Sequence, residues 1–134
     1  MSPFEYKCGM LFGSFDPLHA GHVRLICRAI ELCEEIVVIV DDDEIIRKVK
    51  HREPLFPLNE RRWDLYAIKG VEYVEVESIE TPKRIWVKMY KPDILIKGDD
   101  WKGKAWDGAD LGVPVLYLPY TQGITSTMFH KARK

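Results

Sequence analysis

Residues 13–22, which read G-S-F-D-P-L-H-A-G-H, decide the fold that we predict for this chain. An apolar run ends at Phe12, and apolar residues recur at helical spacing from Val23 onward, so the decamer is predicted to turn a strand into a helix. Gly13 gives the backbone room at the strand end, and Pro17 fits a turn before a helix. Because the first N–H groups of a helix attract anions, we expect a phosphate site here.

Two histidines stand at the expected helix start. His19 and His22 are three positions apart, so both imidazoles lie on one face if the helix begins at or before His19. A phosphate bound there would meet backbone amides and both rings. The same spacing also fits surface residues, a helix cap with its neighbour, or half of a metal site.

The decamer resembles the nucleotide-binding signature of the nucleotidylyltransferase superfamily, in which a glycine, a small residue and Phe-Asp precede His-x-Gly-His. The resemblance implies that His19 and His22 are catalytic and lie on the nucleotide phosphates. It also implies that the other residues of the motif bind the nucleotide, namely Gly13, Ser14, Phe15, Asp16 and Gly21.

Length and composition are those of a globular protein, and residues 1–134 are expected to form a single nucleotidylyltransferase domain. The formal charge of −1 offers no basic field for nucleic acid. No apolar run approaches the ~20 residues that span a bilayer, and the first residues do not resemble a signal peptide, so a cytoplasmic protein without a membrane partner is expected. Cys8, Cys27 and Cys33 lack metal-ligand spacing and are expected to be buried free thiols.

Five short strands are expected. Residues 36–40 are five consecutive β-favouring apolar residues, which predicts a strand covered on both faces of a parallel sheet. Other strands are expected before residue 13 and at 71–76, 93–96 and 113–119, with 71–76 near the sheet edge because its apolar residues alternate with glutamates. Strands alternating with helices predict a three-layer α/β fold, a Rossmann-like, doubly wound parallel sheet.

The helices have recognisable start signals. Residues 41–43, three aspartates, either form a metal cluster or, as we prefer, cap a helix over 44–49. Asn59 is expected to cap the next helix. Thr81 is expected to cap the one after it, with Pro82 at its first position. The expected buried side of that helix consists of Ile85, Trp86, Met89 and Tyr90.

A polar loop with several basic residues, 50–62, follows the strand at 36–40. It is either a solvated connection or part of a ligand site, because open α/β sheets bind ligands at the carboxyl ends of their strands. The superfamily carries a lysine upstream of the arginine of a Pro-x-x-x-Arg element, and Lys50 and Arg61 have that separation. The resemblance implies that Lys50, in preference to Lys48, reaches the triphosphate and that Arg61 is a nucleotide-binding residue.

Residues 97–101, K-G-D-D-W, follow another strand. Gly98 permits close backbone approach, and a carboxylate there can accept hydrogen bonds from a ribose or a base; a plain charged turn is the alternative. G-D-D-W resembles glycerol-3-phosphate cytidylyltransferases, whereas K-P-D-I-L-I-K-G at 91–98 is similar to the adenylyltransferase part of ADP-heptose synthases. The implied nucleotide-binding residues are Gly98, Asp99, Asp100 and Trp101.

A last motif, G-I-T-S-T at 123–127, precedes an expected helix and suits phosphate, although a simple hydroxyl cap is the alternative. The superfamily has Arg-Thr-x-Gly-Ile-Ser-Thr-Thr here, and Tyr120 stands in place of that arginine. Arg52, Arg61 and Arg62 are candidates to supply the charge. The implied nucleotide-binding residues are Gly123, Ile124, Thr125, Ser126 and Thr127.

Together these motifs imply transfer of a nucleoside monophosphate, with CTP favoured over ATP, to a small phosphorylated alcohol such as glycerol 3-phosphate. An adenylyltransferase acting on a sugar phosphate and a non-catalytic nucleotide-binding module are the alternatives. A metal-dependent hydrolase built from His19, His22 and residues 41–43 is a third. Mg²⁺ is the expected cofactor, and the resemblance implies a homodimer. Trp63, Trp101 and Trp106 are candidates to shape the acceptor pocket.

Overall fold

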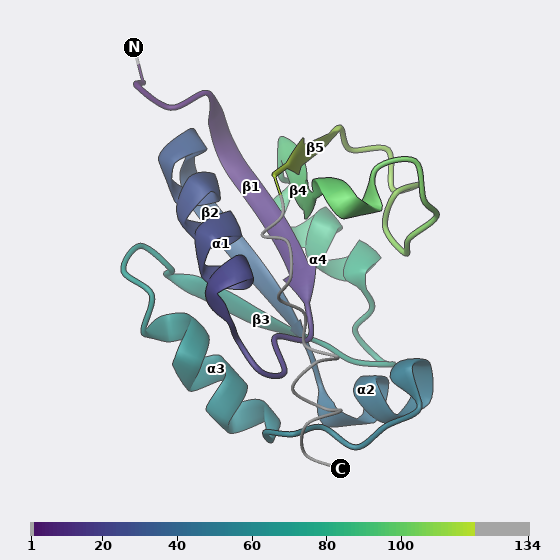
Figure 1. Cartoon of the computed structure of the whole chain (residues 1–134). Coiled ribbons are helices and arrows are strands. Elements are labelled where there is room, and N and C mark those ends of the chain that lie inside the picture. The colour runs from purple at the N-terminus through teal and green to yellow at the C-terminus, as the bar shows by residue number, and fades with distance from the viewer. Residues whose placement is uncertain (1, 120–134) are drawn as a thin grey trace.

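The computed structural model describes residues 2–119, which form an α/β structure around one parallel sheet (Figure 1). The elements are β1 (Tyr6–Gly13), α1 (Ala20–Leu32), β2 (Cys33–Asp41), α2 (Asp43–Lys50), α3 (Leu58–Tyr66), β3 (Tyr73–Glu77), α4 (Lys83–Tyr90), β4 (Ile94–Gly98), the 3₁₀ turn η1 (Asp99–Trp101) and β5 (Val115–Leu118). The motif at 123–127 and Tyr120 lie outside the described residues.

The five strands are all parallel and lie in the order β3-β2-β1-β4-β5. Helices α1 and α3 cover one face of the sheet, and α4 covers the other together with the segment 102–114 (Figure 1). The Rossmann-like, five-stranded fold predicted from the sequence is therefore confirmed. The strand that alternates with glutamates, β3, lies at the sheet edge as expected.

The core is continuous across the sheet because β2 is buried on both faces. Each residue from 36 to 40 is at most 2% exposed. Val38 and Val40 pack into the cluster under α1 and α3, while Val37 and Ile39 pack into the cluster under α4. Alternate residues of a strand point to opposite faces, so a run with no polar position is the pattern that such a central strand requires.

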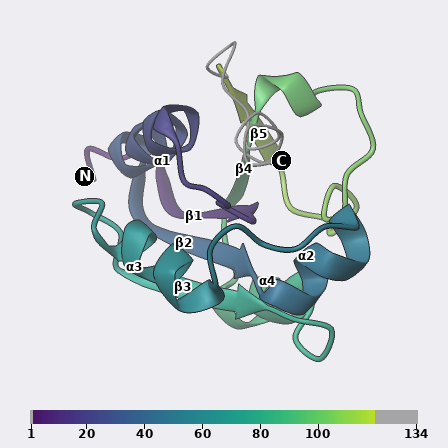
Figure 2. The same ribbon diagram turned by 60° about the horizontal axis from the view of Figure 1, so that its bottom comes forward.

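The chain changes direction across the sheet at β1. It moves outward from β1 to β2 and β3, and then returns to the other side of β1 to form β4 and β5. The carboxyl ends of β1 and β4 therefore lie side by side at a topological switch point, which is where open α/β sheets bind ligands. Figure 2 shows the turn after β1 leading into α1 at this edge.

Two helix starts differ from the prediction. Asp42 caps α2 as expected, accepting a hydrogen bond from the Ile45 N–H at 2.8 Å. Helix α3, however, begins with Pro57 at the N-cap, so Asn59 lies inside its first turn. In α4 the cap is Pro82.

The expected cap of α4, Thr81, bonds elsewhere. Its hydroxyl lies 2.6 Å from the Ser78 hydroxyl, and this contact closes the turn between β3 and α4 instead of capping the helix. A proline at the N-cap offers no side-chain acceptor, so the first N–H groups of α4 receive no side-chain bond from it.

The buried side of α4 is narrower than predicted. Trp86 and Tyr90 pack onto the sheet, and their polar atoms bond the neighbouring edge strand: the Trp86 indole N–H donates to the Val76 carbonyl at 2.9 Å. This anchoring turns the opposite side of the helix outward, so Met89 is 65% exposed and Ile85 is 37% exposed. The apolar periodicity predicted the helix correctly, but Ile85 and Met89, two of the four residues expected on its buried side, are exposed.

One cysteine also differs from the prediction. Cys8 on β1 and Cys33 at the start of β2 are buried free thiols, as expected, but Cys27 is exposed on α1. Among the described residues, no helix combines the length and the apolar character that crossing a bilayer requires.

We predict that Leu95→Ala lowers the free energy of unfolding by about 2–5 kcal/mol, because Leu95 is fully buried on β4 and its truncation leaves a cavity. Met89→Ala removes a comparable side chain from an exposed helix position and is expected to change stability by less than about 0.5 kcal/mol. Urea unfolding followed by circular dichroism measures both. Equal losses in the two variants would contradict this assignment of the core.

Candidate functional site

The turn after β1 is shaped by the side chain of Phe15. Its backbone has a φ of 51°, and its ring folds back over Gly13. A Cβ added at Gly13 would lie 2.9 Å from the Phe15 Cζ, so only glycine leaves room for this ring. Phe15 is buried, and its ring meets the His22 imidazole edge to face at 5.0 Å between centroids. The turn thereby orients the second histidine.

His19 and His22 form a stacked pair at the start of α1. Their ring centroids are 3.8 Å apart, with 22° between the ring planes. His19 is the N-cap, and its Nδ1 accepts a hydrogen bond from the Gly21 N–H at 3.0 Å. The Nδ1 of His22 accepts from the His19 N–H at 3.3 Å. Each histidine thus accepts a hydrogen bond from a backbone N–H that has no partner within the helix, as in a capping box.

These hydrogen bonds determine where each imidazole carries its proton. A nitrogen that accepts a hydrogen bond carries no hydrogen, so we assign both neutral rings the tautomer with the proton on Nε2. Each ring then offers an Nε2–H donor. The cap interpretation and the phosphate interpretation of the two histidines are therefore compatible, because the cap bonds use the Nδ1 atoms and not the Nε2–H groups.

Burial keeps both imidazoles neutral. It lowers the pKa of His19, and it lowers the pKa of His22 to about 3, with further contributions from His19 and the Lys50 ammonium. Removal from water disfavours the charged form of an imidazole. At neutral pH the site therefore presents two neutral N–H donors, and its positive charge comes from lysine and arginine.

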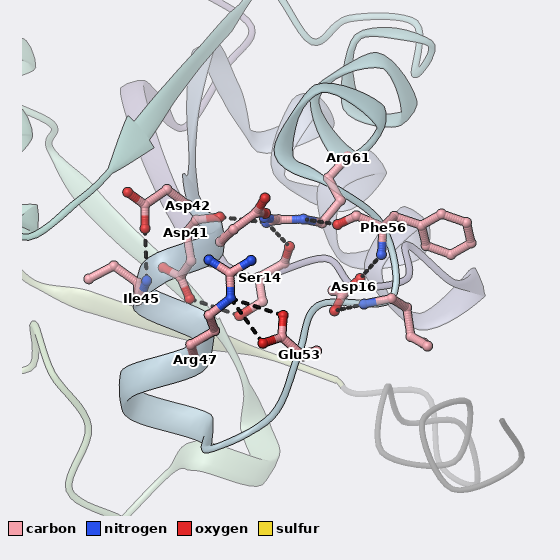
Figure 3. A network of polar contacts seen from close by, with 11 residues as sticks. Ser14, Asp16, Asp41, Asp42, Ile45, Arg47, Glu53, Phe56 and Arg61 are labelled. Atoms are coloured by element: carbon pink, nitrogen blue, oxygen red, sulfur yellow. Dashed lines mark hydrogen bonds and ion pairs between the residues drawn. The ribbon is translucent and has the colours of Figure 1, made fainter. Parts of the chain in front are cut away.

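Arg61 holds the turn and the neighbouring segments together from behind (Figure 3). Its guanidinium is fully buried, with an ion pair to the Asp43 carboxylate at 2.6 Å. It also donates to the carbonyls of Ser14, Asp41 and Phe56. One side chain thus links the turn after β1, the end of β2, the start of α2 and the loop before α3.

Asp16 fixes the same loop from the other side. Its carboxylate is buried and accepts hydrogen bonds from the Leu55 and Phe56 N–H groups, each at 2.9 Å (Figure 3). Ser14 donates its hydroxyl to the Asp41 carboxylate at 2.8 Å. These contacts determine how the segment that carries Lys50 and Arg52 lies against the turn.

A pocket of about 290 Å³ opens at this edge. Most of the predicted site residues within 2–119 line it: Gly13, Ser14, Phe15, His19, His22, Lys50, Gly98, Asp100 and Trp101. The remaining walls consist of Leu11, Phe12, Leu25, Arg52, Ile96 and Lys97. The structure thus brings residues from β1, α1, α2 and β4 together, which only a parallel sheet with aligned carboxyl ends allows.

Lys50 and Lys48 differ in the way that the prediction requires. Lys50, the last residue of α2, lines the pocket, and burial lowers its pKa. Lys48 is exposed and lies 3.4 Å from Glu44 on the outer side of the same helix. Of these two lysines, Lys50 is therefore the one that a phosphate bound in the pocket can reach.

Four residues predicted to bind the nucleotide do not line the pocket. Arg61 and Asp16 are fully buried behind its wall, where they position the segments described above. Gly21 donates its N–H to the His19 Nδ1, and neither Gly21 nor Asp99 lines the pocket. Arg61 and Asp16 are held by contacts that the local sequence pattern does not encode.

Trp63 does not line the pocket either. It is 73% exposed on α3, beside Arg62 and Tyr66, and does not contact the pocket. Of the three tryptophans considered for the acceptor pocket, Trp101 lines it, and Trp106 packs beneath it.

Two cationic residues of the pocket, Arg52 and Lys97, were missed as site residues. The sequence suggested Arg52 only as one of three arginines that could supply the charge of the superfamily arginine at position 120, where this chain has Tyr120. Lys97 follows the apolar run of β4, and its position one residue before Gly98 was the signal that could have identified it.

The aspartates at 41–43 do not form a metal cluster. Asp41 accepts from Ser14, Asp42 caps α2 and Asp43 pairs with Arg61. Within residues 2–119, no group of three or more histidine, cysteine, aspartate or glutamate side chains is arranged to hold a metal ion. The arrangement that a metal-dependent hydrolase needs is thus not found in this part of the chain.

Comparisons with known proteins agree with this geometry. A family model described as cytidylyltransferase-like matches residues 10–129. Glycerol-3-phosphate cytidylyltransferase of Staphylococcus aureus is 31% identical over 116 residues, which cover 87% of this chain and 86% of that protein. The bifunctional protein HldE of Nitratiruptor sp. is 35% identical over 116 residues, 86% of this chain. The chain spans about a quarter of the length of the HldE relatives, and 25% of the Nitratiruptor protein.

A solved structure has the same fold over almost its whole length. The lipopolysaccharide core biosynthesis protein from Thermoplasma volcanium superposes with a TM-score of 0.68 and is 28% identical. The match covers 87% of this chain and 97% of that one.

The parallel sheet, the pocket at its switch point and the histidine pair at the start of α1 are the features expected of the nucleotidyltransferase class. Within that class, the chain belongs to the cytidylyltransferase-like family.

We predict that Arg61→Met lowers the free energy of unfolding by about 3–5 kcal/mol, because it leaves Asp43 and three carbonyl groups without their donor. The matched control is Arg47→Met, which removes an exposed ion pair with Glu53 and is expected to have a much smaller effect, because solvent screens such a pair. Urea unfolding measures both values. Similar losses would contradict the positioning role of Arg61.

We also predict that the His22 ring stays neutral from pH 5 to pH 8. Its pKa lies near 3 in the folded protein, below the ordinary value of about 6.5, so acid protonates it only far below neutrality. Because the unfolded ring binds a proton first, His22 stabilises the fold above pH ~6.5, and this stabilisation is lost as the pH falls toward 3. Ring ¹⁵N NMR in the ligand-free protein should give the Nε2–H tautomer, whereas titration near pH 6.5 would contradict the assignment.

Proposed function

We propose that the pocket transfers a nucleoside monophosphate, CMP in the favoured case, from a nucleoside triphosphate to a small phosphorylated alcohol such as glycerol 3-phosphate. The observation that carries the proposal is the stacked histidine pair at the start of α1, which lines one pocket with Lys50 and Arg52. Polarised N–H groups and cations gathered at a helix start bind a phosphate chain.

The reaction needs alignment and charge stabilisation more than proton transfer. An oxygen of the acceptor phosphate attacks the α-phosphorus, the bond from that phosphorus to the bridging oxygen breaks, and pyrophosphate leaves with the electron pair. The attacking oxygen of a phosphomonoester is already anionic near pH 7, so no general base is required. The site lowers the barrier by orienting two anions and by stabilising negative charge that develops on the phosphoryl oxygens.

Each residue has a distinct role in this proposal. His19 and His22 donate their Nε2–H groups to phosphate oxygens, and their neutrality lets them act as donors across the physiological pH range. Lys50 carries the charge for the leaving phosphates. Arg61 and Asp16 act from behind the wall as positioning residues, because their own hydrogen bonds go to protein groups.

Mg²⁺ fits the donor set as an ion carried by the triphosphate. Such an ion keeps several waters and needs one or two protein carboxylates at most. Asp100, on the pocket wall, is the carboxylate available to it. When bound, the ion would neutralise charge on the phosphate oxygens.

Two relatives support different substrates. The glycerol-3-phosphate cytidylyltransferase is 31% identical to this chain over most of its own length, and this similarity favours CTP and an alcohol phosphate as the substrates. The HldE relative from Nitratiruptor sp. is 35% identical to this chain over part of its own length, and this similarity favours the alternative, adenylyl transfer to a sugar phosphate. Asp100 and Trp101 in the pocket wall are the residues on which we base the preference for CTP.

The test is a panel that combines CTP and ATP with glycerol 3-phosphate and an aldose 1-phosphate, read by pyrophosphate release. We predict turnover with CTP and glycerol 3-phosphate and a loss of about 10²–10³ in kcat for either His19→Ala or His22→Ala. Lys48→Ala is the matched control and should retain the activity of the wild type, because Lys48 lies outside the pocket.

Nucleotide affinity without pyrophosphate release in any combination would favour the binding module. Turnover with ATP and the sugar phosphate alone would favour the adenylyltransferase. Full activity in both histidine variants, once circular dichroism has shown that they fold, would refute the proposed role of the pair.

A further inference from the structure

Lys97 is a cationic residue of the pocket with an unusual environment. It lies on β4, and strand alternation directs its side chain to the same face as Leu95, the face covered by α4. Its Nζ lies 4.7 Å from the ring centroid of Trp101 and 5.1 Å from that of Trp106. Within residues 2–119 no carboxylate lies within ion-pair distance of this ammonium.

A second lysine on the same face provides the contrast. Lys83 lies at 2.6 Å from the Glu77 carboxylate and at 3.4 Å from Asp107, so its charge is neutralised within the protein. Lys97 instead rests on two aromatic faces, which attract a cation weakly and leave most of its charge unneutralised. Of these two lysines, only Lys97 lines the pocket.

The charges that face Lys97 come from four elements. They are Lys83 on α4, Asp41 on β2, Lys50 on α2 and Asp100 on η1. Burial, with the two lysines, lowers the pKa of Lys97 to about 8, and the two aspartates act in the opposite direction. An anion that binds nearby would therefore stabilise the charged form of Lys97.

The two sides of the pocket come from opposite faces of the sheet. His19 and His22 extend from α1, over the face that contains Ile96, while Lys97 and Phe12 belong to the face under α4. A phosphate group bound at the sheet edge between β1 and β4 would meet N–H donors from one side and an ammonium from the other.

We propose that Lys97 binds a phosphate of the nucleoside triphosphate, opposite the histidine pair. This inference rests on the proposed function. It assigns Lys97 to the nucleotide and not to the acceptor because its neighbours Gly98, Asp100 and Trp101, which we propose bind the nucleotide, form the β4 side of the pocket. Trp101 and Trp106 keep the ammonium in place without neutralising it.

The experiment measures dissociation constants by calorimetry for CTP and ATP, without an acceptor, in the wild type, Lys97→Met and Lys97→Arg. Lys102→Met is the matched control, since Lys102 is an exposed lysine just after η1. We expect Lys97→Met to weaken the better-bound nucleotide by about 10- to 100-fold, the range for a hydrogen bond to a charged group. Lys97→Arg should recover part of this loss, and Lys102→Met should bind as the wild type does.

A titration with the corresponding nucleoside, cytidine or adenosine, followed by NMR, separates contact with phosphate from indirect effects through Trp101. Lys97→Met should leave nucleoside binding within about 2-fold of the wild type. In the wild type, nucleotide affinity should also fall as the pH rises through 8, because the ammonium loses its proton, and this fall should be smaller in Lys97→Met.

Several outcomes would overturn the inference. Unchanged nucleotide affinity in Lys97→Met would do so and leave the proposed function intact. An equal loss with the nucleoside would make Lys97 a structural support of Trp101. A change confined to the KM for glycerol 3-phosphate would assign it to the acceptor. Nucleotide binding that depends on Lys97 but never leads to turnover would instead refute the proposed function alone, and a wild type that binds neither nucleotide would refute both.

Discussion

The site depends on two hydrogen bonds in which imidazole nitrogens accept backbone N–H groups. His19 and His22 cap α1 through their Nδ1 atoms, and these bonds place the proton of each neutral ring on Nε2. The same bonds satisfy donors that the first turn of a helix leaves unpaired. In the function that we propose, helix capping and ligand binding fall to different nitrogens of the same rings.

Packing behind the turn makes this arrangement rigid. Phe15 fills the space that Gly13 leaves and presses its edge against His22, while Arg61 joins the turn to β2 and the loop before α3. A buried arginine whose three nitrogens all donate to protein groups holds these segments in one geometry, and removing it leaves buried groups without partners. The geometry of the pocket therefore depends in part on Arg61, which does not line it.

Charge is separated in a way that suits an anionic ligand. Asp16, Asp41 and Asp43 accept hydrogen bonds from the protein and hold the scaffold. Lys50 and Lys97, by contrast, line the pocket with ammonium groups whose pKa values are lowered by burial. Among the described residues that line the pocket, Lys50, Arg52 and Lys97 are cationic and Asp100 is acidic, so the pocket carries an excess of positive charge in a chain whose net charge is only −1.

Local spacing and an unbroken apolar run were sufficient to predict the strand, turn and helix around residues 13–22, the parallel sheet and the histidine pair. Which polar residues reach the pocket depends on tertiary contacts that these patterns do not contain. Arg61 was expected at the nucleotide and is buried behind it, Lys97 was passed over and lines it, and Met89 was expected in the core and faces solvent. Spacing along a chain specifies a face of a helix or strand, but the partner of that face is chosen by contacts between segments distant in sequence, such as Arg61 with Ser14.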